Sequence, residues 1–294
     1  MAQLNLPSRQ LSLEIESFGP PGAPPVLLAM GLGMQLLAWP HAYVEGLVAA
    51  GFRVILFDNR DAGLSGSGTL APHTAMPLAL LASLWGRRFR PAYTLVDMAD
   101  DTLALADALG LEQFDLVGVS MGGMIGQVLA TRAPTRLRRL VSIMSSAGPA
   151  TTPRPRASVL WRILRRPPAG ASAHQLSAHF TRLFTVLGQL TDPAEIGRLR
   201  ERLDRTVRRA YKPEGTSRQL LAVLAHPDRT AEIRKIRQPV LVIHGRRDPL
   251  VPPPAAEHLA RQIPNARLAW LDIGHYLPLS CIPELTRLTV QHLS

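Results

Sequence analysis

The chain has 294 residues, of which 46% are hydrophobic, so it can bury a large core as one domain with room for an inserted segment. Its single cysteine, Cys281, excludes an internal disulfide framework and a cysteine-based zinc site, and we expect neither a metal nor another cofactor. The formal net charge of +11 comes mostly from arginines interleaved with Leu, Ala, Pro and Glu, which favours solvated helix faces over a nucleic-acid surface.

The beginning of the chain has no charged stretch followed by an apolar one, so the sequence shows no signal peptide. The longest apolar runs, 26–39 and 76–86, are interrupted by glycine or too short to span a membrane. We therefore expect a soluble, cytoplasmic protein without stable membrane insertion. We expect it to be a monomer or homodimer that acts on a small molecule and not on nucleic acid.

The first part of the chain predicts a parallel sheet. Residues 11–18 alternate apolar and polar side chains, which predicts a half-exposed antiparallel edge strand. Continuous apolar runs at 26–30 and 53–57 predict buried strands. A helical pattern at 36–50 joins them and ends at Gly51, which caps it. Strand, crossover helix and strand in this order imply a doubly wound α/β sheet.

The next elements continue the same order up to residue 147. An amphipathic helix is expected at 94–109, and two further buried strands are expected at 114–119 and 137–144. From Gly148 the pattern becomes helical, with Pro- and Arg-rich separators and no strand signal before Pro239. The helical stretches are 157–166, 172–188, 192–211 and 216–226.

The α/β order resumes near the end of the chain. The expected strands are 240–244 and 267–271, and the expected helices are 255–263 and 283–292. We therefore predict a core formed by 1–147 and 231–294, with 148–230 as a helical cap insertion. The fold class is α/β, with a doubly wound, mostly parallel sheet.

The stretch 116–124, Leu-Val-Gly-Val-Ser-Met-Gly-Gly-Met, sets one serine between glycines where a strand gives way to a helix. Such a turn strains the backbone of Ser120, and the chain on either side passes too close for a Cβ at the glycines. The hydroxyl would stand at the amino end of a helix, where backbone N–H groups favour negative charge. The motif resembles the nucleophile elbow of the α/β-hydrolase superfamily, so Ser120 is the candidate nucleophile. A glycine-rich turn with a capping serine is the alternative.

A serine hydroxyl needs a base to take its proton and a third group to hold that base. Asp248 and His275 each follow a predicted strand, at the edge of the sheet where ligands bind in doubly wound folds. The order Ser120, Asp248, His275 is the α/β-hydrolase order. Asp272 is a rival acid, but its place three residues before His275 suits a turn. His244, inside a strand, is interpreted as a packed core residue.

By the same resemblance, the oxygen of the tetrahedral intermediate is held by two backbone N–H groups. One belongs to Met121, directly after the nucleophile. The other belongs to Leu32, in the loop 30–33 that follows the first buried parallel strand. Many relatives have His-Gly in this loop, where this chain has Met30-Gly31. That difference changes the supporting contacts of the loop but not a backbone donor.

Three motifs together narrow the resemblance. The Met-Gly loop, the elbow and the segment 58–65 (Asp-Asn-Arg-Asp-Ala-Gly-Leu-Ser) are similar to those of a bacterial serine-esterase branch. That branch includes enzymes of the aclacinomycin methylesterase type, which remove a methyl ester from a polyketide. We expect the segment 58–65 to shape the sheet edge, with Arg60 and Asp61 as a structural ion pair.

The resemblance implies a serine hydrolase that cleaves carboxylic esters through an acyl-enzyme intermediate. A C–C bond hydrolase acting on ring-fission products and a cofactor-free perhydrolase or haloperoxidase use the same three residues and remain alternatives. A non-catalytic small-molecule receptor on this fold is less favoured, because such receptors need not keep a complete triad.

Apolar residues of the cap and of the stretch 76–85 are candidates for substrate binding: Trp161, Phe180, Phe184, Leu80 and Leu84. The cap residues serve equally well to pack the cap on the core. The stretch 76–85 is apolar on nearly every face, so protein must cover it or lipid must meet it. We expect it to pack beside the cap as one wall of the substrate entrance. Burial away from the site and an interfacial lid are the alternatives.

Overall fold

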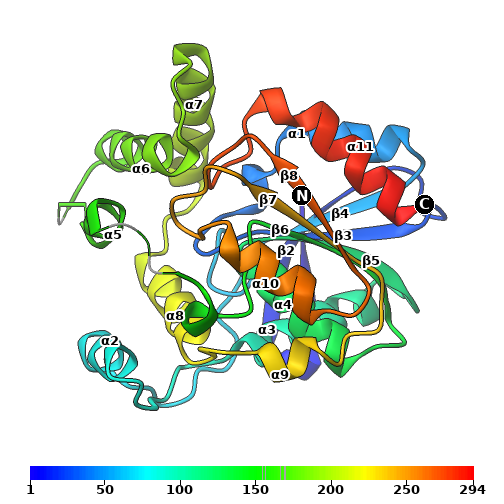
Figure 1. Ribbon diagram of the computed structural model, residues 1–294, viewed down its shortest axis with the longest axis horizontal. Helices are drawn as coiled ribbons and strands as arrows, with labels where there is room; N and C mark the ends of the chain where they lie inside the picture. The colour runs from blue at the N-terminus through cyan, green and yellow to red at the C-terminus, as the bar shows by residue number, and fades with distance from the viewer. Residues whose placement is uncertain (154, 156, 166, 169) are drawn as a thin grey trace.

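The computed structural model describes residues 1–153, 155, 157–165, 167–168 and 170–294, without the side chains of Leu84, Leu160 and Leu164. The described residues form an eight-stranded sheet with helices on both faces and a further group of helices to one side (Figure 1).

The sheet has the order β1-β2-β4-β3-β5-β6-β7-β8. The pairs β1–β2 and β2–β4 are antiparallel, and every pair from β4 to β8 is parallel. This arrangement confirms the doubly wound, mostly parallel α/β sheet. The strands are β1 (Ala2–Leu6), β2 (Leu11–Phe18), β3 (Pro25–Ala29), β4 (Arg53–Phe57), β5 (Phe114–Val119), β6 (Leu137–Ile143), β7 (Val240–Gly245) and β8 (Ala266–Leu271).

The expectation that residues 11–18 form an edge strand is wrong. β1 pairs along β2, with Ala2 opposite Ile15 and Leu6 opposite Leu11, so β1 is the edge. β1 has only five residues, Ala-Gln-Leu-Asn-Leu. A strand of that length at a chain end gives too short an alternation to be recognised from the sequence.

Helices cover both faces of the sheet. α1 (His41–Ala49) and α11 (Ile282–Leu293) pack against each other on one face. α3 (Leu95–Ala108), α4 (Met121–Arg132) and α10 (Pro254–Gln262) cover the other face. Each face has its own buried apolar cluster. The central strands are therefore apolar on both sides, which is why they appear in the sequence as continuous apolar runs.

The single helix expected at 36–50 is divided into two parts. A 3-10 turn covers Leu36–Ala38, and α1 begins only at His41. Pro40 separates them, because proline lacks an N–H and its ring clashes with a preceding helical turn. Gly51 follows the helix with a φ of +91°, the left-handed conformation typical of a helix end.

Between β6 and β7 the described residues form a series of helices: α5 (Ala157–Leu164), α6 (Ala173–Gly188), α7 (Pro193–Arg209), α8 (Pro213–Leu224) and α9 (Thr230–Ile233). α6 and α7 pack against each other, and α5 to α8 lie to the left of the sheet in Figure 1. The short α9, which the sequence pattern did not indicate, packs against α4 and α10 of the core. The cap limits at 148 and 230 stay a prediction.

Two arginines of these helices form buried ion pairs with the segment 58–65. Arg209 contacts Asp58 at 2.7 Å, and Arg218 contacts both oxygens of Asp61, at 2.7 and 2.8 Å. Burial raises the pKa of Asp58 despite the neighbouring guanidinium. Burial would also raise the pKa of Asp61. Hydrogen bonds from Arg218, Ser67 and Tyr93 outweigh burial, so the pKa of Asp61 is lowered. These arginines are structural contacts, so the expectation of solvated helix positions is wrong for them.

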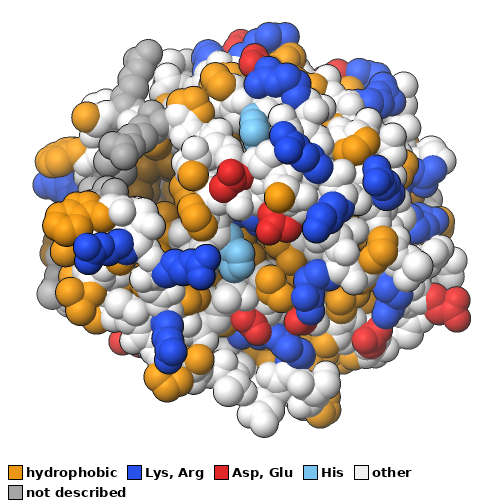
Figure 2. Space-filling model, turned by 60° about the horizontal axis from the view of Figure 1, so that its bottom comes forward, with side chains coloured by type: hydrophobic (Ala, Val, Ile, Leu, Met, Phe, Trp, Pro, Cys, Tyr) orange, Lys and Arg blue, Asp and Glu red, His pale blue; other side chains and the backbone are white. Residues whose placement is uncertain are grey.

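Arg60 and Asp61 do not form the expected ion pair. Arg60 pairs with Asp101 of α3, whereas Asp61 pairs with Arg218 of α8. Asp61 has a φ of +67°, and this left-handed backbone turn directs the two consecutive side chains to different elements. Arg60 thus attaches the segment to the core, and Asp61 attaches it to the cap. On the face shown in Figure 2, the Lys and Arg side chains are spread among hydrophobic and polar ones and form no single patch.

α2 (Met76–Leu84) packs one side against α8, where Ala79 is buried. Its other side is exposed, with exposed fractions of 62% at Leu78 and 69% at Trp85. The expectation that this helix packs beside the cap helices is confirmed by its contact with α8, and its role as a wall of the substrate entrance stays a prediction. Among the described residues, no helix is long and apolar enough to cross a membrane.

Candidate active site

Ser120 lies at the turn between β5 and α4. Its φ of +53° and ψ of −113° are outside the regions that residues with a side chain usually adopt. Its N–H donates to the carbonyl of Ile143 at 2.8 Å, and its carbonyl accepts from Ser145 Oγ at 2.8 Å. The neighbouring strand β6 and the loop after it therefore hold a strained serine at the amino end of α4.

The glycines on either side of Ser120 are required by close backbone contacts. A Cβ on Gly118 would lie 2.3 Å from the carbonyl carbon of Gly122. A Cβ on Gly122 would lie 2.1 Å from the carbonyl oxygen of Ala29. No side chain fits at such distances, so only glycine allows β5, α4 and the end of β3 to approach each other in this way.

Asp248 follows β7, and its side chain is buried. Oδ1 accepts hydrogen bonds from the N–H groups of Leu250 at 2.9 Å and Val251 at 2.8 Å. Oδ2 accepts from Nδ1 of His275 at 2.7 Å. Because a carboxylate only accepts, His275 carries a proton on Nδ1. Its Nε2 is then the nitrogen that can take a proton from another group.

His275 follows β8, and the cap holds its backbone. Its N–H donates to the carbonyl of Leu187, in the last turn of α6, at 2.7 Å. A Cβ on Gly274 would lie 2.4 Å from that same carbonyl, so glycine is needed for the approach. The structure thus joins His275 to Asp248, but among the described residues no hydrogen bond joins it to Ser120. Such hydrogen bonds are often long in ligand-free proteins.

Among the described residues, the rival acid Asp272 forms no ion pair with His275. Its side chain is 78% exposed and forms an ion pair with Arg247 at 2.8 Å. His244 is fully buried in β7. Its Nε2 lies 3.7 Å from Oδ2 of Asp248, so the two histidines face the same carboxylate.

The loop 30–33 passes beside Ser120. A Cβ on Gly31 would lie 3.3 Å from Cβ and 3.9 Å from Oγ of Ser120. Leu32 follows Gly31 directly, and Met121 is the first residue of α4, whose N–H has no partner within the helix. Among the described residues, neither of these two N–H groups donates to an acceptor. Both are therefore available to an oxygen bound near the serine.

Gln219 of α8 supports this loop and was not indicated by the sequence. Its Oε1 accepts from the N–H of Gly33 at 2.7 Å, and its Nε2 donates to the carbonyl of Arg60 at 2.7 Å. α8 also fits closely here, because a Cβ on Gly33 would lie 2.8 Å from Oγ1 of Thr216. Gln219 is fully buried, yet a single glutamine in an amphipathic helix has no local signal of such a role.

The candidate substrate-binding residues lie in different surroundings. Phe180 and Phe184 of α6 are half-buried against a cluster formed by Leu199, Leu203 and Tyr276, the residue after His275. Trp161 of α5 is 60% exposed, with Arg165 over its ring at 5.3 Å.

The two candidates in α2 are described unequally. Leu80 is half-buried, and the side chain of Leu84 lies outside the described residues. The binding role of Leu80 and Leu84, and of the three cap aromatics, stays a prediction.

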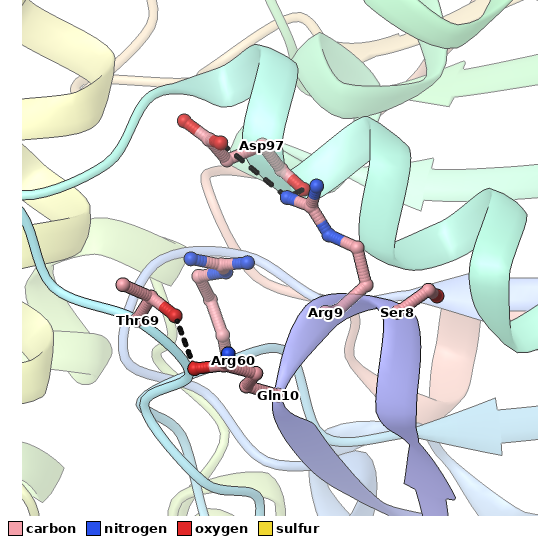
Figure 3. Close-up of a pocket in the computed structure, with 6 residues that line it drawn as sticks. All are labelled: Ser8, Arg9, Gln10, Arg60, Thr69 and Asp97. Atoms are coloured by element: carbon pink, nitrogen blue, oxygen red, sulfur yellow. Dashed lines mark hydrogen bonds and ion pairs between the residues drawn. The ribbon is translucent and has the colours of Figure 1, made fainter.

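A separate polar pocket of about 180 Å³ lies between the β1–β2 connection, the loop after β4 and the start of α3 (Figure 3). Its lining residues are Ser8, Arg9, Gln10, Arg60, Thr69 and Asp97. Its two arginines are paired with carboxylates, Arg9 with Asp97 and Asp101, and Arg60 with Asp101. The pocket contains none of the candidate catalytic residues, so we do not assign it to the reaction.

Cys281 is buried beside the start of α11. Burial raises the pKa of its thiol to about 12, and the negative charge of Glu195 acts in the same direction. The thiol is therefore protonated near neutral pH and is a poor nucleophile. Among the residues that the structure describes, no group of three His, Cys, Asp or Glu side chains could hold a metal ion.

Known proteins with similar sequence and structure include several hydrolases. The family model of the alpha/beta hydrolase fold matches residues 24–280. The rhodomycin D methylesterase DnrP of Streptomyces peucetius is 31% identical over 310 residues, covering 96% of this chain and 95% of that protein. A 2-hydroxymuconate semialdehyde hydrolase of Pseudomonas putida is 27% identical, covering 84% of this chain and 93% of that protein.

The structural match extends over the whole chain. The solved structure of 2-hydroxy-6-oxo-6-phenylhexa-2,4-dienoate hydrolase from Rhodococcus sp. strain RHA1 matches with a TM-score of 0.75 at 21% identity. The match covers 99% of this chain and 98% of that one. The chain belongs to the α/β-hydrolase family. The match to a methylesterase over nearly all of both chains places it among the carboxylic ester hydrolases of this family and confirms the resemblance seen in the sequence motifs.

Proposed function

We propose that this carboxylic ester hydrolase acts through an acyl-enzyme intermediate on Ser120, with His275 as the base and Asp248 as the acid that orients it. The observation that carries the proposal is the 2.7 Å hydrogen bond from Nδ1 of His275 to Asp248. That bond leaves Nε2 as the basic nitrogen at the sheet edge where β5 delivers Ser120. A serine hydroxyl reacts with esters only when such a base accepts its proton.

In the proposed reaction, Oγ of Ser120 attacks the ester carbonyl carbon while Nε2 of His275 takes the hydroxyl proton. The tetrahedral intermediate collapses, the C–O bond to the alcohol breaks, and the alcohol leaves with the proton from His275. Water then attacks the acyl-serine while His275 takes one of its protons. The bond from the acyl carbon to Oγ breaks and His275 returns the proton to Oγ, which releases the carboxylic acid and free Ser120. Asp248 stabilises the imidazolium in both halves of the cycle.

The proposed oxyanion hole consists of the N–H groups of Leu32 and Met121. Its support is the position of Gly31 beside Ser120 and the absence of another acceptor for these two groups among the described residues. Backbone N–H groups that are already fixed stabilise the developing negative charge without reorganising.

The proposed substrate is a small-molecule ester, and no nucleic-acid partner is part of the proposal. One relative is named for its methylesterase activity, so methyl esters are the first compounds to assay. A second candidate activity, hydrolysis of a C–C bond with the same three residues, is favoured by the similarity to the 2-hydroxymuconate semialdehyde hydrolase.

Hydrolysis assays test the proposal. The wild-type protein and Ser120→Ala are compared on methyl esters, on p-nitrophenyl esters of graded chain length, on ring-fission dienones and in peroxide-dependent halogenation. We expect ester turnover by the wild type and a loss of at least ~10³-fold in Ser120→Ala with an unchanged melting temperature. Faster turnover of a dienone than of every ester would favour the C–C hydrolase. Equal ester rates in both proteins would exclude Ser120 as the nucleophile.

A further inference from the structure

His244 lies in β7, four residues before Asp248, and its ring is fully buried. Its Nε2 is 2.8 Å from the carbonyl oxygen of Val251. A carbonyl oxygen only accepts, so Nε2 of His244 must carry the proton. Burial lowers the pKa of His244, although the charge of Asp248 acts in the opposite direction, so the ring is neutral.

The other ring nitrogen of His244 is unused. Among the described residues, Nδ1 has no hydrogen-bond partner, although it is fully buried. An unsatisfied buried acceptor costs free energy, about 1–3 kcal/mol. An aliphatic or aromatic residue would fill this place in the strand without that cost. Packing alone therefore does not explain a histidine here, whereas the contacts of Nε2 do.

Nε2 of His244 acts on the same short loop that carries the proposed acid. It binds the carbonyl of Val251, and the N–H of Val251 binds Oδ1 of Asp248 at 2.8 Å. Nε2 also lies 3.7 Å from Oδ2 of Asp248, the oxygen that accepts from His275. The positively polarised Nε2–H group therefore lies close to the carboxylate oxygen that accepts from the base.

Among the described residues, few charges besides those of Asp248 and His275 lie near His244. On the β8 side, the ring of Trp270 lies edge-on to His244 at 6.1 Å, with the guanidinium of Arg246 over it at 5.3 Å. Arg247 is paired with Asp272 at the surface. On the other side, the pairing of β7 with β6 ends with Ile243, the residue before His244, opposite Ile143.

We propose that His244 is a positioning residue for the reaction: its Nε2–H fixes the loop 248–251 and partly compensates the charge that Asp248 exerts on His275. The proposal rests on the proposed function, since it needs His275 and Asp248 to be the base and its acid. Without the N–H of His244, the loop 248–251 is fixed less firmly and Asp248 orients His275 less well. The negative charge of Asp248 is also less compensated, so it holds a proton on His275 more strongly. The base is then protonated up to a higher pH.

The test compares His244→Leu, which removes the donor, with His244→Gln, which keeps a side-chain N–H. The rates of p-nitrophenyl ester hydrolysis are measured against pH. In His244→Leu we expect kcat to fall about tenfold with little change in KM, by analogy with the loss on removing a partner that orients a metal-bound histidine. The acid side of the pH profile should move up by about half a pH unit. His244→Gln should restore most of both effects.

If the acid side of the profile stays at the wild-type pH in both variants while the melting temperature falls equally, His244 only fills space and the proposal is wrong. If His244→Leu does not fold, His244→Phe replaces it, since it keeps the ring volume without a donor. ¹⁵N NMR of the wild-type protein supplies an independent measurement. The proposal requires a neutral Nε2–H form of His244 over the pH range in which activity is lost, and an Nδ1–H form would contradict it.

The same assays separate this proposal from the proposed function. If Ser120→Ala keeps the wild-type rate, the proposed function fails, whatever the His244 variants do. If Ser120→Ala is inactive and the His244 variants keep the wild-type pH profile, only the role of His244 fails.

Discussion

The turn that carries Ser120 and the loop 30–33 beside it are held by different parts of the chain. The core holds the turn, through the contacts of Gly118 with Gly122 and of Gly122 with Ala29. The loop is held from α8, where Gln219 accepts from the N–H of Gly33. The proposed nucleophile is thus fixed by the core, whereas one of the two proposed oxyanion donors, Leu32, lies in a loop that α8 also supports.

The proposed base and acid show the same division. Asp248 takes two N–H groups from its own loop after β7. The backbone of His275, in contrast, donates to the carbonyl of Leu187 in α6. Of the serine turn, the loop 30–33, Asp248 and His275, the helices α6 and α8 therefore contact the loop and His275. If the proposed function holds, these helices contribute to the geometry of the reaction.

The largest loss of activity is expected from a substitution of Asp248, the proposed acid, which the core holds. Asp248→Asn removes the charge that orients His275 and should lower kcat by about 10⁴-fold, as in other triads with this change. Asp272→Asn is the matched control, because Asp272 is exposed and paired with Arg247. Steady-state kinetics of the two variants check the prediction, and equal losses at both positions would mean that Asp248 is not the acid.

A smaller effect is expected where the cap supports the loop. Gln219→Leu removes the acceptor for the N–H of Gly33 and should lower kcat by about 10- to 100-fold with little change in KM. The loss should be below the roughly 10²- to 10³-fold cost of deleting a direct oxyanion donor. Gln291→Leu on the exposed side of α11 is the control. A raised KM with an unchanged kcat would show that α8 affects substrate binding and does not support the loop 30–33 for the reaction.

The smallest effect is expected in α2. Leu80→Ser should change the ratio of kcat/KM between short and long p-nitrophenyl esters by about five- to tenfold, the lower end of the effect of one methylene in an apolar pocket. Leu81→Ser, at a site that is 47% exposed, should leave the ratio unchanged.

The outcomes for α2 also separate its three possible roles. A lower melting temperature in Leu80→Ser with unchanged relative rates would show that α2 only packs against α8. A loss seen only with emulsified substrates would indicate an interfacial lid in place of a wall of the entrance.

The parts of the fold that the sequence predicted are those with a local cause. β4 and β5 have the expected limits, because buried parallel strands are short apolar runs between turns. The turn at Ser120 was recognisable because close backbone contacts require glycine on both sides of it. The pairing of Asp248 with His275 was predictable because each residue follows a strand that the sequence indicates, and parallel strands end at the same edge of the sheet.

The parts that the sequence did not predict depend on contacts between distant segments. Gln219 and Arg218 each bind residues more than 150 positions away, so their own surroundings in the chain show nothing unusual. The same holds for Arg60, whose partner is Asp101 and not the adjacent Asp61. Which side of α2 would be covered could not be read from its composition, because that depends on where α8 lies.

The role of Ser120 as the nucleophile is tested most directly by locating the site of covalent modification. The protein is treated with a serine-reactive phosphonate ester, and the adduct is located by mass spectrometry of its peptides, with Ser120→Ala as the control. We expect one adduct per chain, on Ser120, together with loss of ester hydrolysis. An adduct on any other residue, or equal labelling of Ser120→Ala, would contradict the account.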